Sequence, residues 1–239
     1  MAQLNGAQIT WLGHATFKVT TPQNKVILID PWIEGNPKSP AEARQLEKVD
    51  LILVTHGHTD HINDVVSTAK KFHSQVAALV ETATWVGSQG VENVIGFNIG
   101  GSINVDGITV SMTQAFHSSG IDSKGGTVYG GAPVGYVIEL ENGLKLYHAG
   151  DTCAFGDMQL IRELYTPDIA LLPIGDFYTM GPKGAALSVR LLGVKHVIPM
   201  HYGTFPILVG TPAQLKDELR KLGLESVEVI EMEPGQTIK

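Results

Sequence analysis

Six consecutive residues constrain this chain more than any other stretch: the segment 56–61, His-Gly-His-Thr-Asp-His. They follow an apolar run at 49–54 that has the pattern of a buried strand, and a helical pattern begins after them. The 239 residues hold only nine histidines, and three of these fall in the six positions, beside a carboxylate. Imidazole nitrogens and carboxylate oxygens bind divalent metals such as zinc. We therefore expect metal ligands at this strand end.

The spacing inside segment 56–61 places these ligands in a loop rather than along a helix. Two zinc ligands on one helical face lie about four residues apart, whereas His56 and His58 are only two apart. We expect a loop at the carboxyl end of the strand, with Asp60 and His61 leading into the helix that follows. Gly57 is expected to let the backbone turn so that successive side chains converge.

Three further ligand candidates each follow an apolar run with the pattern of a strand. They are His117, Asp151 and His201, which come after the runs 110–116, 144–149 and 197–200. A strand end is a rigid support, which suits a metal ligand. Spacing alone also allows each histidine to be an ordinary core or sheet-edge residue, so both interpretations stay open at this point.

A strand followed by His-x-His-x-Asp-His resembles the metal motif of the metallo-β-lactamase superfamily, a group of mostly binuclear zinc hydrolases. The segments 11–15 (Trp-Leu-Gly-His-Ala) and 30–32 (Asp-Pro-Trp) are similar to one branch of it. That branch holds small metal-dependent hydrolases near the ascorbate-phosphate lactonases and the N-acyl-phosphatidylethanolamine phospholipases. The likeness covers nearly the whole chain.

This resemblance implies a set of seven ligands for two divalent metal ions. One ion is expected to bind His56, His58 and His117, the other Asp60, His61 and His201, with Asp151 bridging both. Zinc is the expected metal, with manganese, nickel or iron as alternatives. His58 stands where diiron, flavin-associated relatives usually carry Glu, which disfavours redox chemistry.

Two divalent cations beside two carboxylates leave net positive charge, which favours a bridging hydroxide near neutral pH. The expected function is a binuclear hydrolase that uses this hydroxide on a small ester, lactone or phosphodiester. Asp60 and His14 are the expected catalytic residues. For His14, the resemblance suggests a group that hydrogen-bonds a ligand or donates a proton, against the alternative of a hairpin strand residue.

Several other polar residues have expected roles. Asp30 is expected to hydrogen-bond a ligating histidine and fix its tautomer. Asp64 is expected to be an exposed acid in the first turn of a helix, and Cys153 a buried small thiol. His148 is expected to be mainly structural.

We expect two loops to form the substrate pocket. The glycine-rich segment 118–133 is predicted to be a mobile loop on one side of the cleft, and residues 177–181 are predicted to lie on the other. Tyr202, Tyr178 and Met180 are candidates for its walls.

Two other functions are compatible with the fold. One is a mononuclear-iron dioxygenase acting on thiol-derived substrates. The other is a degenerate, non-enzymatic binding protein, which the seven filled ligand positions disfavour.

The hydrophobic pattern predicts one α/β domain over residues 1–239. By resemblance it is a four-layer αβ/βα sandwich with mixed sheets and outer helices. Strand patterns lie at 9–20, 26–29, 49–54, 76–80, 94–116, 135–141, 144–148, 169–174, 197–200 and 227–232. Helices are expected at 40–47 behind a capping box at Ser39, after Asn63, at 82–89, around 160–164 with Leu160, Ile161 and Leu164 inward, at 182–192, and from Pro212 to Leu222.

Composition narrows the partners. A net charge of −7 and a pI near 5.7, with no long basic run, argue against nucleic acid. No apolar run approaches the roughly 20 residues of a spanning helix, so we expect no membrane insertion. The single cysteine suits a reducing compartment, and no signal peptide is evident, so a cytoplasmic location and a small-molecule substrate are expected. The sequence says nothing of the oligomeric state.

Overall fold

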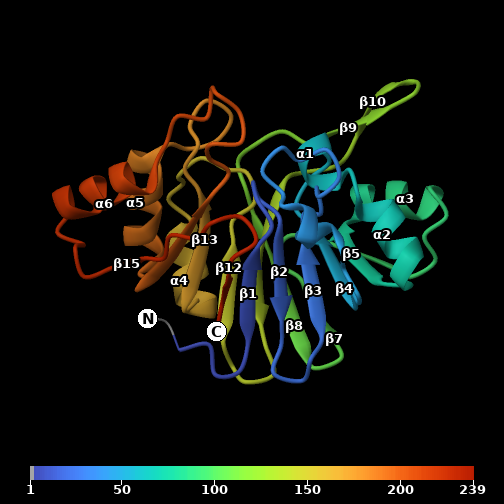
Figure 1. Cartoon of the computed structure of the whole chain (residues 1–239), viewed down its shortest axis with the longest axis horizontal. Coiled ribbons are helices and arrows are strands. Elements are labelled where there is room, and N and C mark those ends of the chain that lie inside the picture. Colours follow the sequence, from blue (N-terminus) through green and yellow to red (C-terminus); the bar gives the residue numbers. More distant parts are fainter. Residues whose placement is uncertain (1–2) are drawn as a thin grey trace.

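The computed structural model describes residues 3–239, apart from the side chain of Ala43. Two mixed seven-stranded sheets face each other, and helices cover the outer face of each (Figure 1). The expected four-layer αβ/βα sandwich is confirmed. In spatial order, the first sheet consists of β16 (Thr237–Ile238), β1 (Gln8–Trp11), β2 (Phe17–Thr20), β3 (Val26–Ile29), β4 (Leu51–Val54), β5 (Gln75–Leu79) and β6 (Val94–Phe97).

The second sheet has the same plan of an antiparallel part joined to a parallel part. Its spatial order is β15 (Glu228–Val229), β14 (His196–Met200), β13 (Ile169–Pro173), β12 (Lys145–His148), β11 (Val134–Glu139), β8 (Ile108–Gln114) and β7 (Ser102–Val105). Strands β3 to β6 and strands β12 to β15 pair in parallel. Carboxyl ends of parallel strands meet at one sheet edge, so each sheet offers an edge that can collect side chains for a site.

Helices fill the two outer layers. On the first sheet these are α1 (Thr59–Ile62), α2 (Val65–Phe72) and α3 (Val80–Ser88), and on the second α4 (Met158–Tyr165), α5 (Pro182–Leu192) and α6 (Pro212–Lys221). The last helix begins with a capping box that we did not predict, in which Thr211 and Gln214 are bonded reciprocally. The box expected at Ser39 is absent, and Ala41–Arg44 forms only a short 3₁₀ turn. No helix within residues 3–239 is long and apolar enough to cross a membrane.

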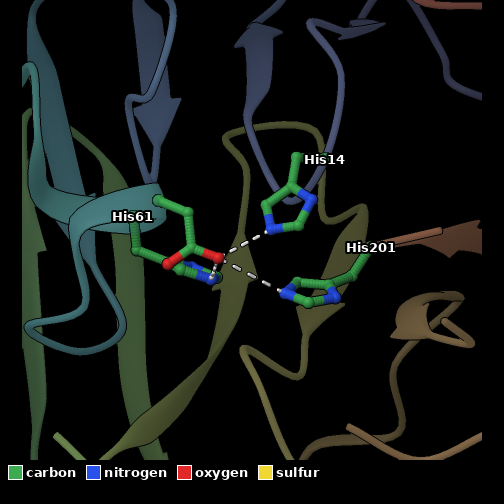
Figure 2. A group of neighbouring side chains, drawn as sticks. His14, His61 and His201 are labelled. Atoms are coloured by element: carbon green, nitrogen blue, oxygen red, sulfur yellow. Dashed lines mark hydrogen bonds and ion pairs between the residues drawn. The ribbon is translucent and has the colours of Figure 1, made fainter. Parts of the chain in front are cut away.

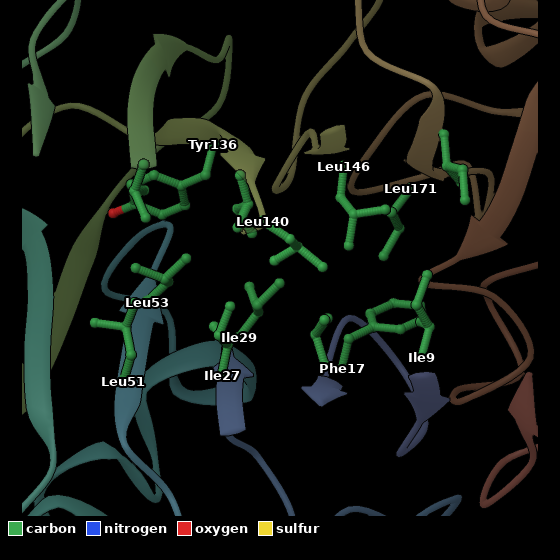
Figure 3. Packing of buried hydrophobic residues seen from close by; sticks show 14 of the residues in the cluster. Ile9, Phe17, Ile27, Ile29, Leu51, Leu53, Tyr136, Leu140, Leu146 and Leu171 are labelled. Atoms are coloured by element: carbon green, nitrogen blue, oxygen red, sulfur yellow. The ribbon is translucent and has the colours of Figure 1, made fainter. Parts of the chain in front are cut away.

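The strands are apolar on both faces because each sheet is covered on both sides. Leu51 and Leu53 of β4 point between the sheets, whereas Ile52 and Val54 pack under the helices. In the same way, Leu171 of β13 enters the central core. Figure 3 shows this core, where aliphatic side chains of the first sheet meet Tyr136, Leu146 and Leu171 of the second.

The glycine-rich segment 118–133 is not the structureless loop that we predicted. It contains the hairpin β9 (Gly120–Ser123) and β10 (Gly126–Tyr129), which projects from the body of the molecule. Ile121 is buried at the base of the hairpin, whereas all of β10 is exposed. The apolar pattern missed this element because only one of its side chains is anchored in a core.

Two other predictions about helix faces and strands were wrong. In α4, Ile161 is buried as predicted, but Leu160 and Leu164 are exposed and the other buried residue is Met158, so the inward face is rotated around the helix from the predicted one. The strand expected at 227–232 pairs only over Glu228–Val229. The chain then leaves the second sheet and adds β16 beside β1 of the first, an exchange that apolar alternation does not reveal.

Tyr136 connects the sheets immediately before the histidine-rich segment. It is fully buried, and its hydroxyl donates to the carbonyl oxygen of Val54 at 2.6 Å. Tyr136→Phe leaves that buried carbonyl short of a donor, so the free energy of unfolding is expected to fall by about 1–3 kcal/mol. Urea denaturation measures this. Tyr129→Phe, on the exposed strand β10, is the control and should change stability by less than about 0.5 kcal/mol; an equal loss in both variants would contradict the prediction.

Candidate metal centre

All seven predicted ligands lie just beyond strand ends at one edge of the sandwich. In the first sheet β4 leads to His56, and His58 begins the single turn of α1, which carries Asp60 and His61. In the second sheet His117 lies beyond β8, Asp151 beyond β12 and His201 directly after β14. The loop placement inferred from the spacing is confirmed, and the seven side chains come together across the two sheets.

Three of these histidines form a first cluster. The Nε2 atom of His56 lies 3.0 Å from Nδ1 of His58, and Nε2 of His117 lies 3.2 Å from the same atom. Burial lowers the pKa of all three rings, so they are neutral near pH 7. Three neutral imidazole nitrogens that converge on one point form a donor set for a cation.

The second cluster consists of Asp60 and three histidines. Figure 2 shows the three histidines, His14, His61 and His201, converging. His14 Nε2 lies 2.8 Å from Asp60 Oδ2, while Nε2 of His201 and of His61 lie 3.7 and 3.8 Å from it. Burial would raise the pKa of Asp60, but His61 and the hydrogen bond from His14 outweigh it, and the pKa lies well below its usual range. Asp60 is therefore an ionised, partly screened carboxylate among imidazoles.

Asp151 lies between the two clusters. Its Oδ2 atom is 3.6 Å from His117 Nε2 of the first cluster, and 3.4 and 3.0 Å from the Nε2 atoms of His61 and His201 in the second. The residue is almost completely buried. Asp151 Oδ2 therefore lies within 3.6 Å of histidines from both clusters.

Four buried polar atoms in this centre have no hydrogen-bond partner of good geometry among the described residues. They are His61 Nε2, Asp151 Oδ1, and His201 Nδ1 and Nε2. A buried polar atom without a partner costs free energy, and all four belong to three predicted ligands, His61, Asp151 and His201. The side chains thus fit a divalent cation, which would satisfy the atoms that face one another.

A buried carboxylate directly after β3 orients one of the predicted ligands. Asp30 is fully buried and accepts from the Thr55 amide at 2.7 Å, the Thr55 hydroxyl at 2.6 Å and His61 Nδ1 at 2.8 Å. The bond from Nδ1 turns His61 Nε2 toward Asp151. The hydrogen bond expected between Asp30 and a predicted ligand is therefore present.

His14 is bonded at both ring nitrogens. Asp60 can only accept, so Nε2 carries the proton and donates to it, and Nδ1 then accepts from the Thr204 hydroxyl at 2.8 Å. Burial and the nearby His201 lower the pKa of His14 to about 4, so the ring is neutral near pH 7. The hydrogen bond from His14 Nε2 fixes the position of the Asp60 carboxylate.

The backbone around the centre is unusual in one respect. His14, Asp30 and His201 all have positive φ, between 47° and 56°, a region that non-glycine residues seldom adopt. The backbone amide of His201 also donates to the carbonyl oxygen of His14 at 3.0 Å. Such conformations persist where the surrounding structure enforces them, and they cluster at functional sites.

Gly57 has a different purpose from the one predicted. Its φ is not in the left-handed region, but a Cβ atom there would lie 2.4 Å from the side chain of Ile121. Glycine is therefore required because the hairpin base packs directly on the metal loop, and the convergence of ligands comes from α1 beginning at Thr59.

Three expectations about neighbouring polar residues have clear outcomes. Asp64 is buried rather than exposed, because its carboxylate accepts from the backbone amides of Ile33 and Glu34. Cys153 is exposed rather than buried. His148 is structural as predicted: its Nδ1 accepts from the Gly150 amide, and its Nε2 donates to the carbonyl oxygen of Ala15.

A pocket of about 530 Å³ opens beside the two clusters. Both predicted loops reach it, one through Ser118 and the other through Tyr178. Two of the residues expected in the pocket walls do not line the pocket. Tyr202 stacks on Trp11 instead, and Met180 is buried under α5. The pocket is lined by Trp32, His58, Thr59, Asp60, His117, Ser118, Asp151, Tyr178, His201 and Phe205.

The roles of Trp32, Thr204 and Phe205 were missed from the sequence. The two aromatic rings stack on each other at the pocket, and the Thr204 hydroxyl donates to His14. One signal was available: Thr204 and Phe205 follow His201 closely, in a short segment that continues from a predicted ligand.

This geometry agrees with the comparisons with known proteins. A family model described as the beta-lactamase superfamily domain matches residues 25–202, which include all seven predicted ligands but not His14. Because that match covers well over half of the chain, the protein belongs to the metallo-β-lactamase superfamily.

Within the superfamily, the chain belongs to the UPF0173 metal-dependent hydrolases. It is 52% identical over 236 residues to the protein of that name from Rubrobacter xylanophilus, covering 98% of this chain and 97% of the relative. Identity to the one from Koribacter versatilis is 50% over 234 residues, with 98% of both chains covered. Among solved structures, a metallo hydrolase of Ignicoccus hospitalis has a TM-score of 0.85 and 38% identity, with 97% of both chains covered. The protein is a metal-dependent hydrolase, which agrees with the expected enzyme class rather than with the dioxygenase or non-enzymatic alternatives.

Replacing Asp30 tests its control of the ligand geometry. Asp30→Asn removes the charge that fixes the His61 tautomer, and loss of such a partner typically weakens metal binding by 10–100-fold. Zinc affinity measured by competition with a chelator should fall by about that factor. Asp64→Asn is the matched control, since it also alters a buried acid, whose carboxylate accepts from two backbone amides and from the side chain of Asn63 rather than from a predicted ligand. Unchanged zinc affinity in Asp30→Asn would contradict the inference that Asp30 fixes the geometry of His61.

The metal-free protein should show an opposite pH dependence for stability and for metal binding. Burial would lower the pKa of His201, but Asp151 outweighs it and raises the pKa to about 9. A raised folded-state pKa contributes stability below about pH 6.5, the unfolded value, and this contribution is lost as the pH rises through about 9. A metal ligand must be deprotonated, so zinc affinity should rise over the same range.

Thermal unfolding of metal-free protein at pH 6.5 and 9, and calorimetric zinc titrations in buffers of different ionisation enthalpy, measure the two effects. Proton release on zinc binding is expected at pH 7. Binding without proton release at that pH would mean that His201 is already neutral.

Proposed function

We propose that the chain is a single metallo-hydrolase domain that binds two zinc-type divalent ions and hydrolyses a small ester, lactone or phosphodiester. The observation that carries the proposal is the pair of donor clusters with Asp151 between them. His56, His58 and His117 would hold one ion, and Asp60, His61 and His201 the other. Distances of 3.0–3.6 Å from Asp151 Oδ2 to both sets support a bridging carboxylate.

Six imidazole and carboxylate groups around one carboxylate favour zinc, with manganese, nickel or iron as alternatives. When bound, two such cations would supply a water activated for attack near neutral pH and positive charge for the oxyanion that develops. No serine or cysteine nucleophile is required.

The protein groups around the ligands position them. Asp30 sets the tautomer of His61, and the neutral ring of His14 donates its Nε2 proton to Asp60. Both ring nitrogens of His14 are engaged in hydrogen bonds. We therefore propose that His14 influences the reaction by positioning Asp60. Thr204 completes this chain of hydrogen bonds at His14 Nδ1.

We also propose that the enzyme acts in the cytoplasm on a small molecule. An exposed free thiol at Cys153 suits a reducing compartment. A pocket of about 530 Å³ has the size of a small-molecule site.

His58→Ala and Asp151→Ala test the function directly. Each should lower turnover to the level of the metal-free protein while circular dichroism and the unfolding transition remain those of a folded chain. Elemental analysis after dialysis should find two zinc ions per wild-type chain and fewer in both variants. The assay is a zinc-reconstituted screen over aryl esters, lactones and bis-aryl phosphodiesters.

His73→Asn is the control, because His73 is exposed and its positive φ of 54° is tolerated by asparagine. Full activity in His58→Ala, with metal content unchanged, would end the proposal.

A further inference from the structure

Resting on the proposed function, we propose a narrower substrate class: an uncharged ester or lactone that carries an aromatic group, rather than an anionic phosphodiester. The inference comes from the walls of the pocket beside the ligand clusters. These walls combine an exposed aromatic face with a lack of cationic side chains.

One wall is a continuous set of rings that reaches the ligands. Trp32 and Phe205 stack with centroids 5.9 Å apart and planes at 28°. Both rings contact His14, with centroid distances of 5.2 and 5.9 Å, and His14 lies 3.8 Å from the ring of His201. A flat group that binds on this wall is therefore held one ring away from a predicted metal ligand.

A second aromatic group lies at the mouth. Tyr178 lines the pocket and meets Phe177 edge-on at 4.7 Å. Tyr178 is 55% exposed and Phe205 37%, although both are large rings beside a cavity. Exposed aromatic surface gathered at a pocket marks a place where an apolar group binds.

Apart from the cations that the predicted ligands would hold, the walls of the same pocket offer little to an anion. None of its ten described lining residues is lysine or arginine, the side chains that usually recognise phosphate. Apart from the predicted ligands and Trp32, the polar lining residues carry neutral hydroxyls. The Thr59 hydroxyl donates to the carboxylate of Asp122 at 3.3 Å. Asp122 adds negative charge near the mouth, which disfavours a substrate that carries its own negative charge.

The reaction on such a substrate is an ordinary hydrolysis. Water adds its hydroxyl to the acyl carbon, the bond from that carbon to the ester oxygen breaks, and the departing oxygen takes a proton. An acid and an alcohol result, and no oxidant or second substrate is consumed. The aromatic wall would bind the ring of either half of the molecule.

Matched esters test the aromatic wall. Benzyl acetate and ethyl acetate release alcohols of similar basicity, so their kcat/KM ratio reports recognition of the ring. For zinc-loaded wild type we expect a ratio of at least about tenfold, the size of a good aromatic contact. Phe205→Ala should bring the ratio close to one, mainly through KM. Leu164→Ala, an exposed apolar truncation on α4 outside the pocket lining, should leave it unchanged.

A negatively charged ester and a binding measurement complete the test. 4-(Acetoxymethyl)benzoate has the same ester as benzyl acetate plus a carboxylate, and its kcat/KM should be at least about tenfold lower. Saturation-transfer NMR should detect benzyl alcohol on metal-free wild type and on Leu164→Ala but not on Phe205→Ala, which tests the wall without turnover.

The outcomes separate this inference from the function on which it rests. Turnover of bis(p-nitrophenyl) phosphate with a higher kcat/KM than benzyl acetate would overturn the inference and leave the hydrolase intact. Equal ratios in wild type and Phe205→Ala, or ring binding that survives the substitution, would do the same. A zinc-loaded wild type that hydrolyses none of the esters, lactones or phosphodiesters would overturn the proposed function as well.

Discussion

The centre depends on the separation of the two sheets, because neither sheet carries a complete set of ligands. The first contributes the loop and turn after β4, and the second contributes His117, Asp151 and His201. Two backbone hydrogen bonds between the sheets fix their separation at this edge. The Val134 amide donates to the carbonyl oxygen of Thr55 at 3.0 Å, and the His201 amide donates to the carbonyl oxygen of His14 at 3.0 Å. With the buried Tyr136 hydroxyl on Val54, these bonds hold the sheets where the core between them ends and the ligands begin.

Much of the fold could be predicted because a strand buried on both faces leaves a continuous apolar run. Strands β3, β4, β13 and β14 were found in this way, and β3, β4 and β14 lead to Asp30, His56 and His201 of the centre. The hairpin at 120–129 and the short β16 could not be found, since one has a single buried anchor and the other pairs over only two residues. The face of α4 was misplaced by one residue because Leu160 and Leu164 are apolar yet exposed, and periodicity alone cannot tell such residues from core.

The ligand positions were predictable because their chemistry is rare and local. Three histidines within six residues need an explanation that packing does not give, and the other three positions were identified by resemblance. Hydrogen-bond partners that lie far apart in the sequence were harder to predict. The bond from Asp30 to His61 was expected, whereas the bond from Thr204 to His14 spans 190 positions and leaves no local pattern. The aromatic wall was missed for the same reason, since Trp32 and Phe205 meet only in the folded chain.

The buried polar atoms that suit the centre for binding metal also lower the stability of the metal-free fold. His61 and His201 keep nitrogen atoms buried without good partners, and Asp151 keeps a carboxylate oxygen in the same state; each such atom costs about 1–3 kcal/mol. Pairing with Asp151 and Asp60 offsets part of that cost by holding protons on His61 and His201. Those protons occupy the positions that cations would take. The chain therefore stores, in its buried polar atoms, a free-energy difference that metal binding releases, and this links the stability of the edge to its loading. Since the ligands come from both sheets, that gain also favours the sheet packing on which the centre depends.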